Sequence, residues 1–319
     1  MGWAYTQGLH DIGNGCYAYL QPNGTWGWSN AGLVTDSGQT LLVDTLMDLK
    51  LTRVMLERMR TAVPASARID LLFNTHGNPD HYFGNELAGA ATIVATEHCA
   101  AEIKGTRPEM LAAMMANYRM LGEGAAFAHE VMGGFDFTGI TLTPPTQTFH
   151  GALTLAVGRK EVQLIEVGPA HTKGDAIAYL PAERTVFTGD ILFIGSHPVM
   201  WAGPVGNWIA ACERILALDV DIVVPGHGPV TDKTGVRETR DYFRWIESEA
   251  RQRWQSKIPA EQTARELVKA RYAQWGEGER MAANVRALYR EFDQKTDAPN
   301  VLEEFAAMAR LHRELKRSA

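Results

Sequence analysis

The sequence predicts a layered α/β protein, with α+β character, that continues into a helical C-terminal extension. Three patterns predict it. Apolar segments bounded by Gly, Asn and Pro alternate with amphipathic helical patterns over about 10–98. Strands with two-residue alternation fill about 138–190, and the chain is almost entirely helical from 233 onward. We therefore expect a layered domain over 1–232 and a helical extension over 233–319.

The individual elements follow from local patterns. Short strands with Gly and Asn turns fill about 10–45, and 48–63 carry apolar residues at helical spacing. A buried strand then breaks at Gly77 and Pro79, and a short helix and a strand follow it. A helix over about 206–217 and the strand in VDIVVPGHG complete the layered domain.

The sequence pattern over 98–135 predicts a helical insertion that is rich in methionine. Methionine is a flexible apolar residue that fills irregular gaps in cores or lines adaptable pockets. We expect most of these methionines to pack in a core.

Composition excludes several classes of function. The 319 residues carry 31 Lys and Arg against 37 Asp and Glu, a net charge of −6, so we expect neither a nucleic-acid nor a membrane partner. Three separated cysteines without a CxxC pair argue against a disulfide framework. No secretory signal or apolar run of about 18 residues is seen, so we expect a cytoplasmic protein that acts on a small molecule.

Chemistry-bearing residues cluster where apolar strands end. The segment NTHGNPDH places two imidazoles, a carboxylate and an amide on one loop after a buried strand. Three more strand ends carry one potential ligand each, in VGPAHTKGD, TVFTGD and VVPGHGP. Imidazole and carboxylate are the usual ligands of zinc, so the pattern predicts a metal centre. Its ligands would come from His76, Asp80, His81, His171, Asp190 and His227.

The order of these motifs resembles that of the metallo-β-lactamase superfamily. That family has a THxHxDH motif, then a single His, a GD at a strand end and a GH loop, and about 10–232 of this chain supply the series. Asp44, in LLVDT, matches an early acidic position of the family. The resemblance implies an αββα sandwich with a metal centre at one edge of its two sheets. It also implies a first site of His76, Asn78 and His171, a second of Asp80, His81 and His227, and Asp190 as a bridge between them.

Asn78 departs from the family pattern, because it stands where the family has its second histidine. An amide oxygen is neutral and binds zinc more weakly than imidazole does. We therefore expect one or two Zn²⁺ per chain, with the weaker site at Asn78.

The resemblance implies a zinc-dependent hydrolase in which a metal-bound hydroxide attacks an ester, lactone, thioester or amide, with Asp80 and Asp190 as catalytic residues. Three alternatives stay open. One is a non-acyl reaction, such as hydrolytic dehalogenation or cleavage of a sulfate or phosphate ester. The second is a non-catalytic metal-binding protein of the same fold, and the third is a di-iron redox enzyme.

Aromatic residues near the motifs predict a mainly hydrophobic or aromatic substrate. Few Lys or Arg residues lie close to the proposed ligands in sequence, which argues against a highly anionic substrate. Amphipathic patterns in the extension indicate a packing or homodimer surface, or a cap over the pocket. The residues proposed to contact substrate are Trp26, Trp28, His197, Met200, Trp201 and Asn207.

Overall fold

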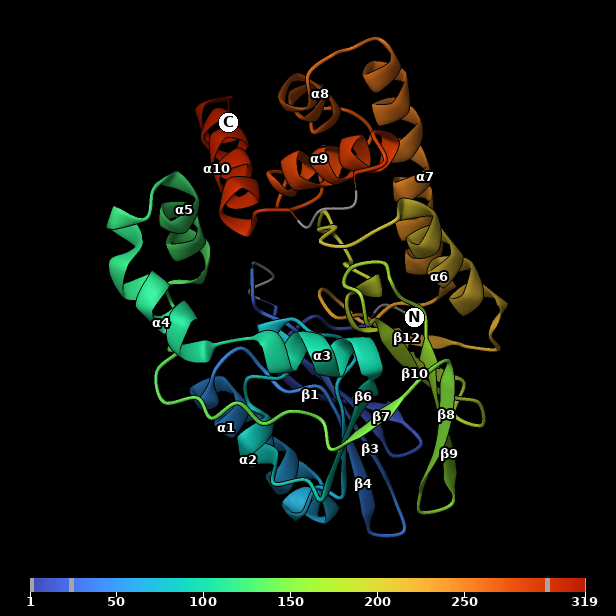
Figure 1. Ribbon diagram of the computed structural model, residues 1–319. Helices are drawn as coiled ribbons and strands as arrows, with labels where there is room; N and C mark the ends of the chain where they lie inside the picture. The colour runs from blue at the N-terminus through green and yellow to red at the C-terminus, as the bar shows by residue number, and fades with distance from the viewer. Residues whose placement is uncertain (1–2, 23–25, 296–298, 319) are drawn as a thin grey trace.

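Two β-sheets packed face to face, with helices on both outer faces, form the body of the protein (Figure 1). The computed structural model describes residues 3–22, 26–295 and 299–318. This arrangement confirms the predicted layered α/β fold with a helical C-terminal region. None of the described helices combines the length and hydropathy needed to cross a bilayer.

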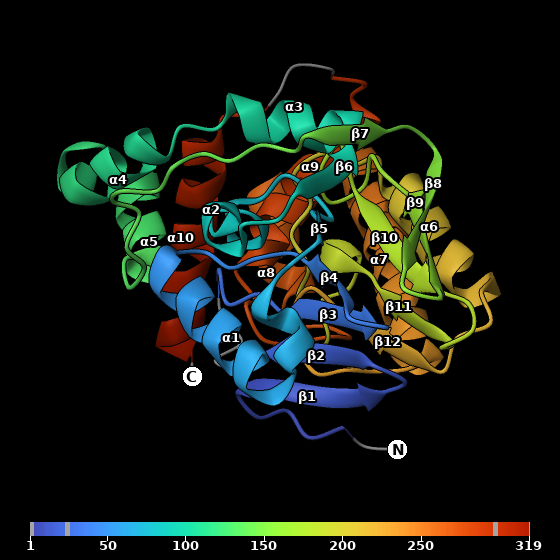
Figure 2. The same ribbon diagram turned by 90° about the horizontal axis from the view of Figure 1, so that it is seen from below.

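The larger sheet has seven strands in the order β1-β2-β3-β4-β5-β6-β7. β1 to β4 pair in antiparallel fashion, whereas β4 to β7 pair in parallel, because helices return the chain between several of these strands. The first two helices lie along the outside of this sheet (Figure 2). The elements are β1 (Gly8–Gly13), β2 (Cys16–Leu20), β3 (Ala31–Asp36), β4 (Gln39–Val43), α1 (Leu49–Ala62), η1 (Pro64–Ala67), β5 (Leu71–Phe73), η2 (Pro79–His81), α2 (Asn85–Ala88), β6 (Thr92–Thr96) and β7 (Gln147–Phe149).

The smaller sheet has five strands in the order β12-β11-β10-β9-β8. Only β11 and β12 pair in parallel, and α6 lies on the connection between them. The predicted strand pattern begins late, since 138–146 form no strand before β7. The elements are β8 (Ala152–Val157), β9 (Lys160–Glu166), β10 (Ala176–Leu180), β11 (Thr185–Phe187), η4 (Gly189–Ile191), α6 (Val205–Ala217) and β12 (Ile222–Val224).

The core between the sheets requires a close approach at β3. Phe187 of the smaller sheet is buried against this strand, and a Cβ at Gly32 would lie only 2.4 Å from its ring. Glycine is therefore the residue that allows the two sheets to meet here. On the outer face, α1 packs Met55, Leu56 and Met59 against the larger sheet.

The insertion and the C-terminal extension pack against each other. The final helix, α10, runs beside α5 of the insertion, and both lie at one end of the sandwich (Figure 1). Met110 and Met120 are exposed on the insertion by 67% and 85%, so the expected core packing is wrong for these two. The elements are α3 (Glu97–Gly105), α4 (Pro108–Asn117), η3 (Tyr118–Met120), α5 (Glu123–Met132), α7 (Lys233–Gln255), α8 (Ala260–Leu267), α9 (Arg280–Phe292) and α10 (Val301–Ser318).

Local sequence explains where these helices begin. Asp232 caps α7 by accepting a hydrogen bond from the Thr234 amide, and Thr96 caps α3 through the Cys99 amide. The apolar faces of α7 and α9 are buried within the chain, at residues such as Phe243 and Leu288. These faces therefore hold the extension to the sandwich, while a homodimer through this region stays a prediction.

Candidate metal centre and substrate cavity

Three of the predicted ligands meet at the first position of the centre. One ligand atom each from His76, His171 and Asp190 lie within 4.8 Å of one another, and all three residues are buried. His76 follows β5, His171 lies on the loop between β9 and β10, and Asp190 lies in η4 after β11. Strand ends that are far apart in sequence thus deliver the three side chains to one edge of the sandwich.

A second trio lies next to the first. Ligand atoms of Asp80, His81 and His227 also lie within 4.8 Å of one another, with all three residues buried. Asp80 and His81 belong to η2, the single turn that begins at Pro79. Pro79 suits the first position of this turn, because proline fixes φ in the helical range and needs no amide donor there.

Asp190 lies between the two trios. Its Oδ2 is 3.3 Å from Nε2 of His171 and 3.3 Å from Nε2 of His227, and its Oδ1 is 3.1 Å from Nε2 of His81. Oδ2 is also 3.6 Å from Nε2 of His76. One carboxylate therefore reaches imidazoles of both trios, as the proposed bridge between two metal sites requires.

Hydrogen bonds orient the imidazoles toward the centre. Nδ1 of His171 donates to the Val199 carbonyl at 2.7 Å, and Nδ1 of His81 donates to Asp44 at 2.8 Å, so Nε2 of each ring faces inward. Nε2 of His76 and of His81 are buried and have no hydrogen-bond partner among the described residues. Inward, unpartnered nitrogens beside buried carboxylates fit a divalent metal ion, since buried polar atoms normally have partners.

The protonation preferences of the four histidines differ. Burial lowers the pKa of His76 below its usual value and that of His171 to about 4, which keeps both rings neutral. Burial also opposes the charged form of His81 and His227, but the carboxylates of Asp190 and Asp80 outweigh it. They raise the pKa of His227 to about 9 and that of His81 above its usual value. The buried carboxylates thus attract positive charge to this centre.

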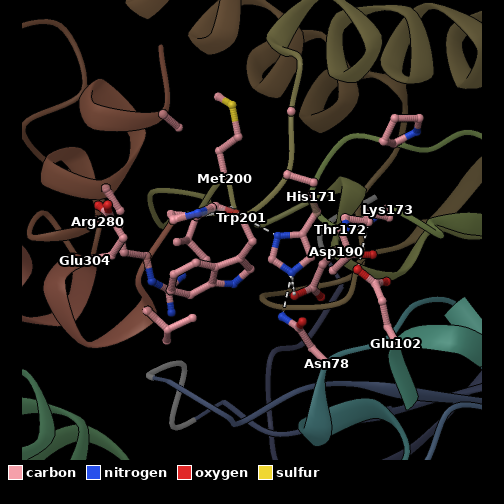
Figure 3. Close-up of a pocket in the computed structure, with 18 of the residues that line it drawn as sticks. Asn78, Glu102, His171, Thr172, Lys173, Asp190, Met200, Trp201, Arg280 and Glu304 are labelled. Atoms are coloured by element: carbon pink, nitrogen blue, oxygen red, sulfur yellow. Dashed lines mark hydrogen bonds and ion pairs between the residues drawn. The ribbon is translucent and has the colours of Figure 1, made fainter. Parts of the chain in front are cut away.

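Asn78 lies at the first trio. Its Nδ2 is 2.9 Å from Nε2 of His171, so the end of the side-chain amide faces the inward nitrogen (Figure 3). Rotation of the amide by half a turn exchanges its oxygen and nitrogen at this position. Asn78 is therefore placed to offer a neutral oxygen where the family pattern has an imidazole.

The centre opens into a cavity of about 920 Å³. Asn78, Asp80, His171, Asp190 and His227 form part of its wall. Much of the remaining wall is apolar or aromatic. These apolar residues include Trp26, Met47, Leu111, Met132, Phe193, Val199, Met200, Trp201, Ala283, Ala287, Val301 and Phe305.

The helical extension supplies the wall that faces the centre. Arg280, Ala283, Ala287 and Arg290 of α9 all line the cavity, and their spacing places them along one side of the helix. Alanine is small, so the middle of this face leaves room between the helix and the centre. Figure 3 shows Arg280 and Glu304 on the helical side of the cavity, across from Glu102 of α3.

A model of the metallo-β-lactamase superfamily matches residues 24–227, which is more than half of the chain. The chain belongs to the metallo-β-lactamase superfamily. Solved structures of the superfamily have the same fold. The alkylsulfatase Pisa1 from Pseudomonas sp. aligns with a TM-score of 0.66 at 16% identity, over 90% of this chain and 50% of its own. A metallo-β-lactamase from Pontibacter korlensis aligns with a TM-score of 0.55 at 20% identity, over 75% of this chain and 99% of its own.

Three curated relatives match shorter segments. The α-subunit of 2,4-dinitroanisole O-demethylase from Nocardioides sp. is 34% identical over 26% of this chain and 26% of its own length. A linear primary-alkylsulfatase from Pseudomonas sp. is 28% identical over 37% of this chain and 24% of its own. A probable hydroxyacylglutathione hydrolase of Schizosaccharomyces pombe is 32% identical over 31% of this chain and 38% of its own length. The chain thus covers well under half the length of each relative.

Three of the residues proposed to contact substrate lie in the cavity wall of this chain, namely Trp26, Met200 and Trp201. The other three lie outside the described lining. The Trp28 ring packs on Phe135 at a centroid distance of 5.2 Å. Fully buried His197 places Nδ1 3.2 Å from the Tyr242 hydroxyl, and Asn207 lies in the first turn of α6. Packing within the chain accounts for Trp28 and His197.

The cavity wall holds more cations than the sequence near the proposed ligands indicates. Lys173, Arg280, Arg290 and Lys295 all line the cavity, and three of them come from the extension or from the segment just after α9. The sequence did not indicate Arg280, Arg290 and Lys295 as residues of the site, because none of the three lies near a ligand motif in the sequence. The only available signal was the helical spacing of α9, which does not reveal what its face contacts.

Asp44 positions His81 from outside the centre. It accepts hydrogen bonds from the Thr75 amide at 2.8 Å, the Thr75 hydroxyl at 2.7 Å and Nδ1 of His81 at 2.8 Å. Its φ of 63° is uncommon for a residue other than glycine, although aspartate tolerates this region better than most. The early acidic position of the family therefore has a physical role here, which is to fix one imidazole and the strand end after β5.

Replacing Asp44 by asparagine should weaken metal binding at the second trio. The amide can still accept a hydrogen bond, but it lacks the charge that strengthens Nδ1–H donation from His81. We expect metal affinity to fall by about 10- to 100-fold, as for other residues that orient metal-bound histidines. Competition with a chromogenic chelator measures this change. Asp219→Asn, at an exposed aspartate outside the cavity, is the matched control, and equal affinities in the two variants would argue against this role.

Proposed function

We propose that the chain is a metal-dependent hydrolase that uses Zn²⁺, one or two ions per chain, and acts on a small molecule with a mainly apolar or aromatic body. The observation that carries this proposal is the position of the two ligand trios, which lie on either side of the Asp190 carboxylate and open into one largely apolar cavity. Superfamily membership supports the same reaction class.

The residues of the chain divide the work in this proposal. His76, Asn78 and His171 would hold one ion, Asp80, His81 and His227 would hold the other, and Asp190 lies within reach of both positions. When bound, such ions supply an activated water and polarise the bond that is cleaved. Asp80, whose Oδ2 lies 3.3 Å from Nε2 of His227, is the group we assign to proton transfer. The aromatic wall formed by Trp26, Trp201 and Phe305 excludes water from the substrate body.

An ester, lactone, thioester or amide is the first class of bond we propose. A sulfate ester or another non-acyl bond is the second, and the cations in the cavity wall favour it. Relatives named for both kinds of reaction, a hydroxyacylglutathione hydrolase and an alkylsulfatase, support keeping the two classes.

The extension is proposed to act as a cap, since α9 and α10 contribute a wall of the cavity. A homodimer through other parts of 233–319 is compatible with this role. We also propose a small-molecule substrate, no nucleic-acid or membrane partner, and a cytoplasmic location.

Metal content of protein purified without added metal tests the proposal first. Elemental mass spectrometry should find about one zinc per chain if the Asn78 site is weak, and about two if it is filled. Iron in place of zinc would support the redox alternative. A protein that neither retains nor rebinds metal would support the non-catalytic alternative.

Hydrolysis assays then separate the bond classes. We would compare 4-nitrophenyl octanoate, an octanoyl thioester and octyl sulfate, each with and without a chelator. Chelator-sensitive turnover of the first two supports acyl hydrolysis, and turnover of octyl sulfate alone supports the second class. Turnover that survives complete metal removal would contradict a metal-dependent mechanism.

A further inference from the structure

Arg280, at the start of α9, is a buried cation that forms no ion pair within the described part of the chain. The residue is only 2% exposed. Its one hydrogen bond runs from Nη1 to the His197 carbonyl at 2.9 Å, and its Nε has no partner among the described residues. No carboxylate of those residues forms an ion pair with it. The Nε–Nη2 edge of the guanidinium is therefore unused.

Aromatic rings hold this guanidinium beside the cavity. Its Cζ lies 4.4 Å from the ring centroid of Trp26 and 5.3 Å from that of Phe193, and both rings line the cavity together with Arg280. Phe193 also stacks on His227 of the second trio, with centroids 4.9 Å apart and planes 3° apart. A single ring thus contacts both the cation and a proposed metal ligand.

The neighbouring acids are engaged elsewhere. Glu279 accepts a hydrogen bond from Nε1 of Trp26 at 2.9 Å through Oε1, and its Oε2 lies 3.4 Å from Nδ1 of His312. Glu277 is close enough to act on Arg280 through its charge, but no ion pair joins the two side chains. The charges of these two acids make the electrostatic potential around Arg280 less positive. Neither acid bonds to the Nε–Nη2 edge of the guanidinium.

A buried charge without a bonded partner is energetically unfavourable. An arginine in this state at a cavity wall therefore points to a ligand that supplies the missing anionic hydrogen-bond acceptor. The Nε–Nη2 edge of arginine has the geometry to donate two parallel hydrogen bonds to a carboxylate or to an oxygen pair of a sulfate or sulfonate. Trp26 and Phe193, which flank the guanidinium, leave that planar edge as its means of binding a ligand.

We propose that Arg280 binds an anionic group of the substrate, which is therefore an amphiphile with an apolar body. The body lies against Ala283 and Ala287 of α9 and the aromatic wall, and the bond to be cleaved lies at the two trios. This inference rests on the proposed function, because it takes the cavity as the substrate site. The anionic group is either a carboxylate attached to the apolar body or the charged oxygens of a sulfate-type ester.

Calorimetric titration of the protein as purified, with its own metal content, tests this assignment without any turnover. The ligands are octanoate, octane-1-sulfonate and neutral octan-1-ol, which share one chain length. We expect wild type to bind at least one of the anions about tenfold or more tightly than octan-1-ol. In Arg280→Met that preference should fall by about threefold or more relative to wild type. Any anion bound at the metal sites contributes equally to both proteins, so this fall measures the contribution of Arg280 alone.

Two further variants make the result specific. Arg265→Met removes an exposed arginine of α8 that lies outside the cavity, and it should keep the full anion preference. Arg280→Lys keeps the charge but loses the planar edge, so its preference should be intermediate, and it covers the case in which Arg280→Met does not fold. Circular dichroism checks folding in each variant.

The outcomes separate this inference from the proposed function. Preference for octanoate assigns the anion to the substrate body, and preference for octane-1-sulfonate alone assigns it to a sulfate-type ester. Equal binding of anions and octan-1-ol by wild type, or a preference in Arg280→Met as large as that of wild type, overturns the role of Arg280. An Arg280-dependent preference in a protein that hydrolyses nothing would instead contradict the proposed function and leave the anion site standing.

Discussion

Asp80→Ala should reduce turnover by at least about 1,000-fold, which corresponds to about 4 kcal/mol of lost transition-state stabilisation. The carboxylate belongs to the second trio and lies 3.3 Å from His227, so its removal takes away both a ligand and the proposed proton-transfer group. The fold should survive, because Asp80 is tied to Ser29 through its backbone carbonyl rather than its side chain. Turnover, metal content and thermal unfolding of the same preparation test this expectation.

The control for this variant is Asp219→Ala, which removes an exposed carboxylate outside the cavity. It should retain full turnover and metal content. Activity in Asp80→Ala close to that of wild type would exclude the proposed mechanism. A large fall in unfolding temperature would show instead that Asp80 stabilises the fold, and Asp80→Asn would then be needed to isolate its charge.

Asn78→His should increase metal affinity at the first trio by at least about tenfold, because imidazole is a better zinc ligand than a neutral amide. The side chain already faces Nε2 of His171, so the substitution adds a ligand where the geometry can receive one. Competition with a chelator measures the affinity of the first ion, and elemental mass spectrometry measures the number of ions per chain.

Asn78→Ala completes this series by removing the amide altogether. The expected order of affinity is His, then Asn, then Ala, with the second trio unaffected in all three proteins. If wild type and Asn78→Ala bind metal equally, Asn78 is no ligand. If Asn78→His leaves both stoichiometry and affinity unchanged, the explanation of a weak first site is wrong.

The metal centre was predictable because each ligand follows an apolar strand. His76, His171, Asp190 and His227 all lie just beyond strand ends, and the carboxyl ends of neighbouring strands share one edge of a sheet. The one unusual candidate ligand, Asn78, is singled out by its place within a six-residue motif. Short loops after strands therefore carry enough positional information to assemble the centre from sequence.

The substrate wall was predicted less well, because helical periodicity identifies a face without identifying what that face contacts. Arg280 lies 53 residues beyond His227 and reaches the cavity only through the packing of α7 to α9. Trp26 and Trp28 were equivalent in sequence, yet Trp26 bonds to Glu279 and lines the cavity, whereas Trp28 packs on Phe135. Such choices depend on tertiary neighbours that no local pattern contains.

The α9 wall has a consequence for how this protein can diversify. All proposed metal ligands lie between His76 and His227, whereas the facing wall begins at Arg280. Substitutions at positions such as Ala283 and Ala287 alter the shape of the chamber without touching any group that holds a metal ion. Natural selection, or a library of variants confined to α9, can therefore change which molecule the cavity binds and leave the proposed metal ligands unchanged.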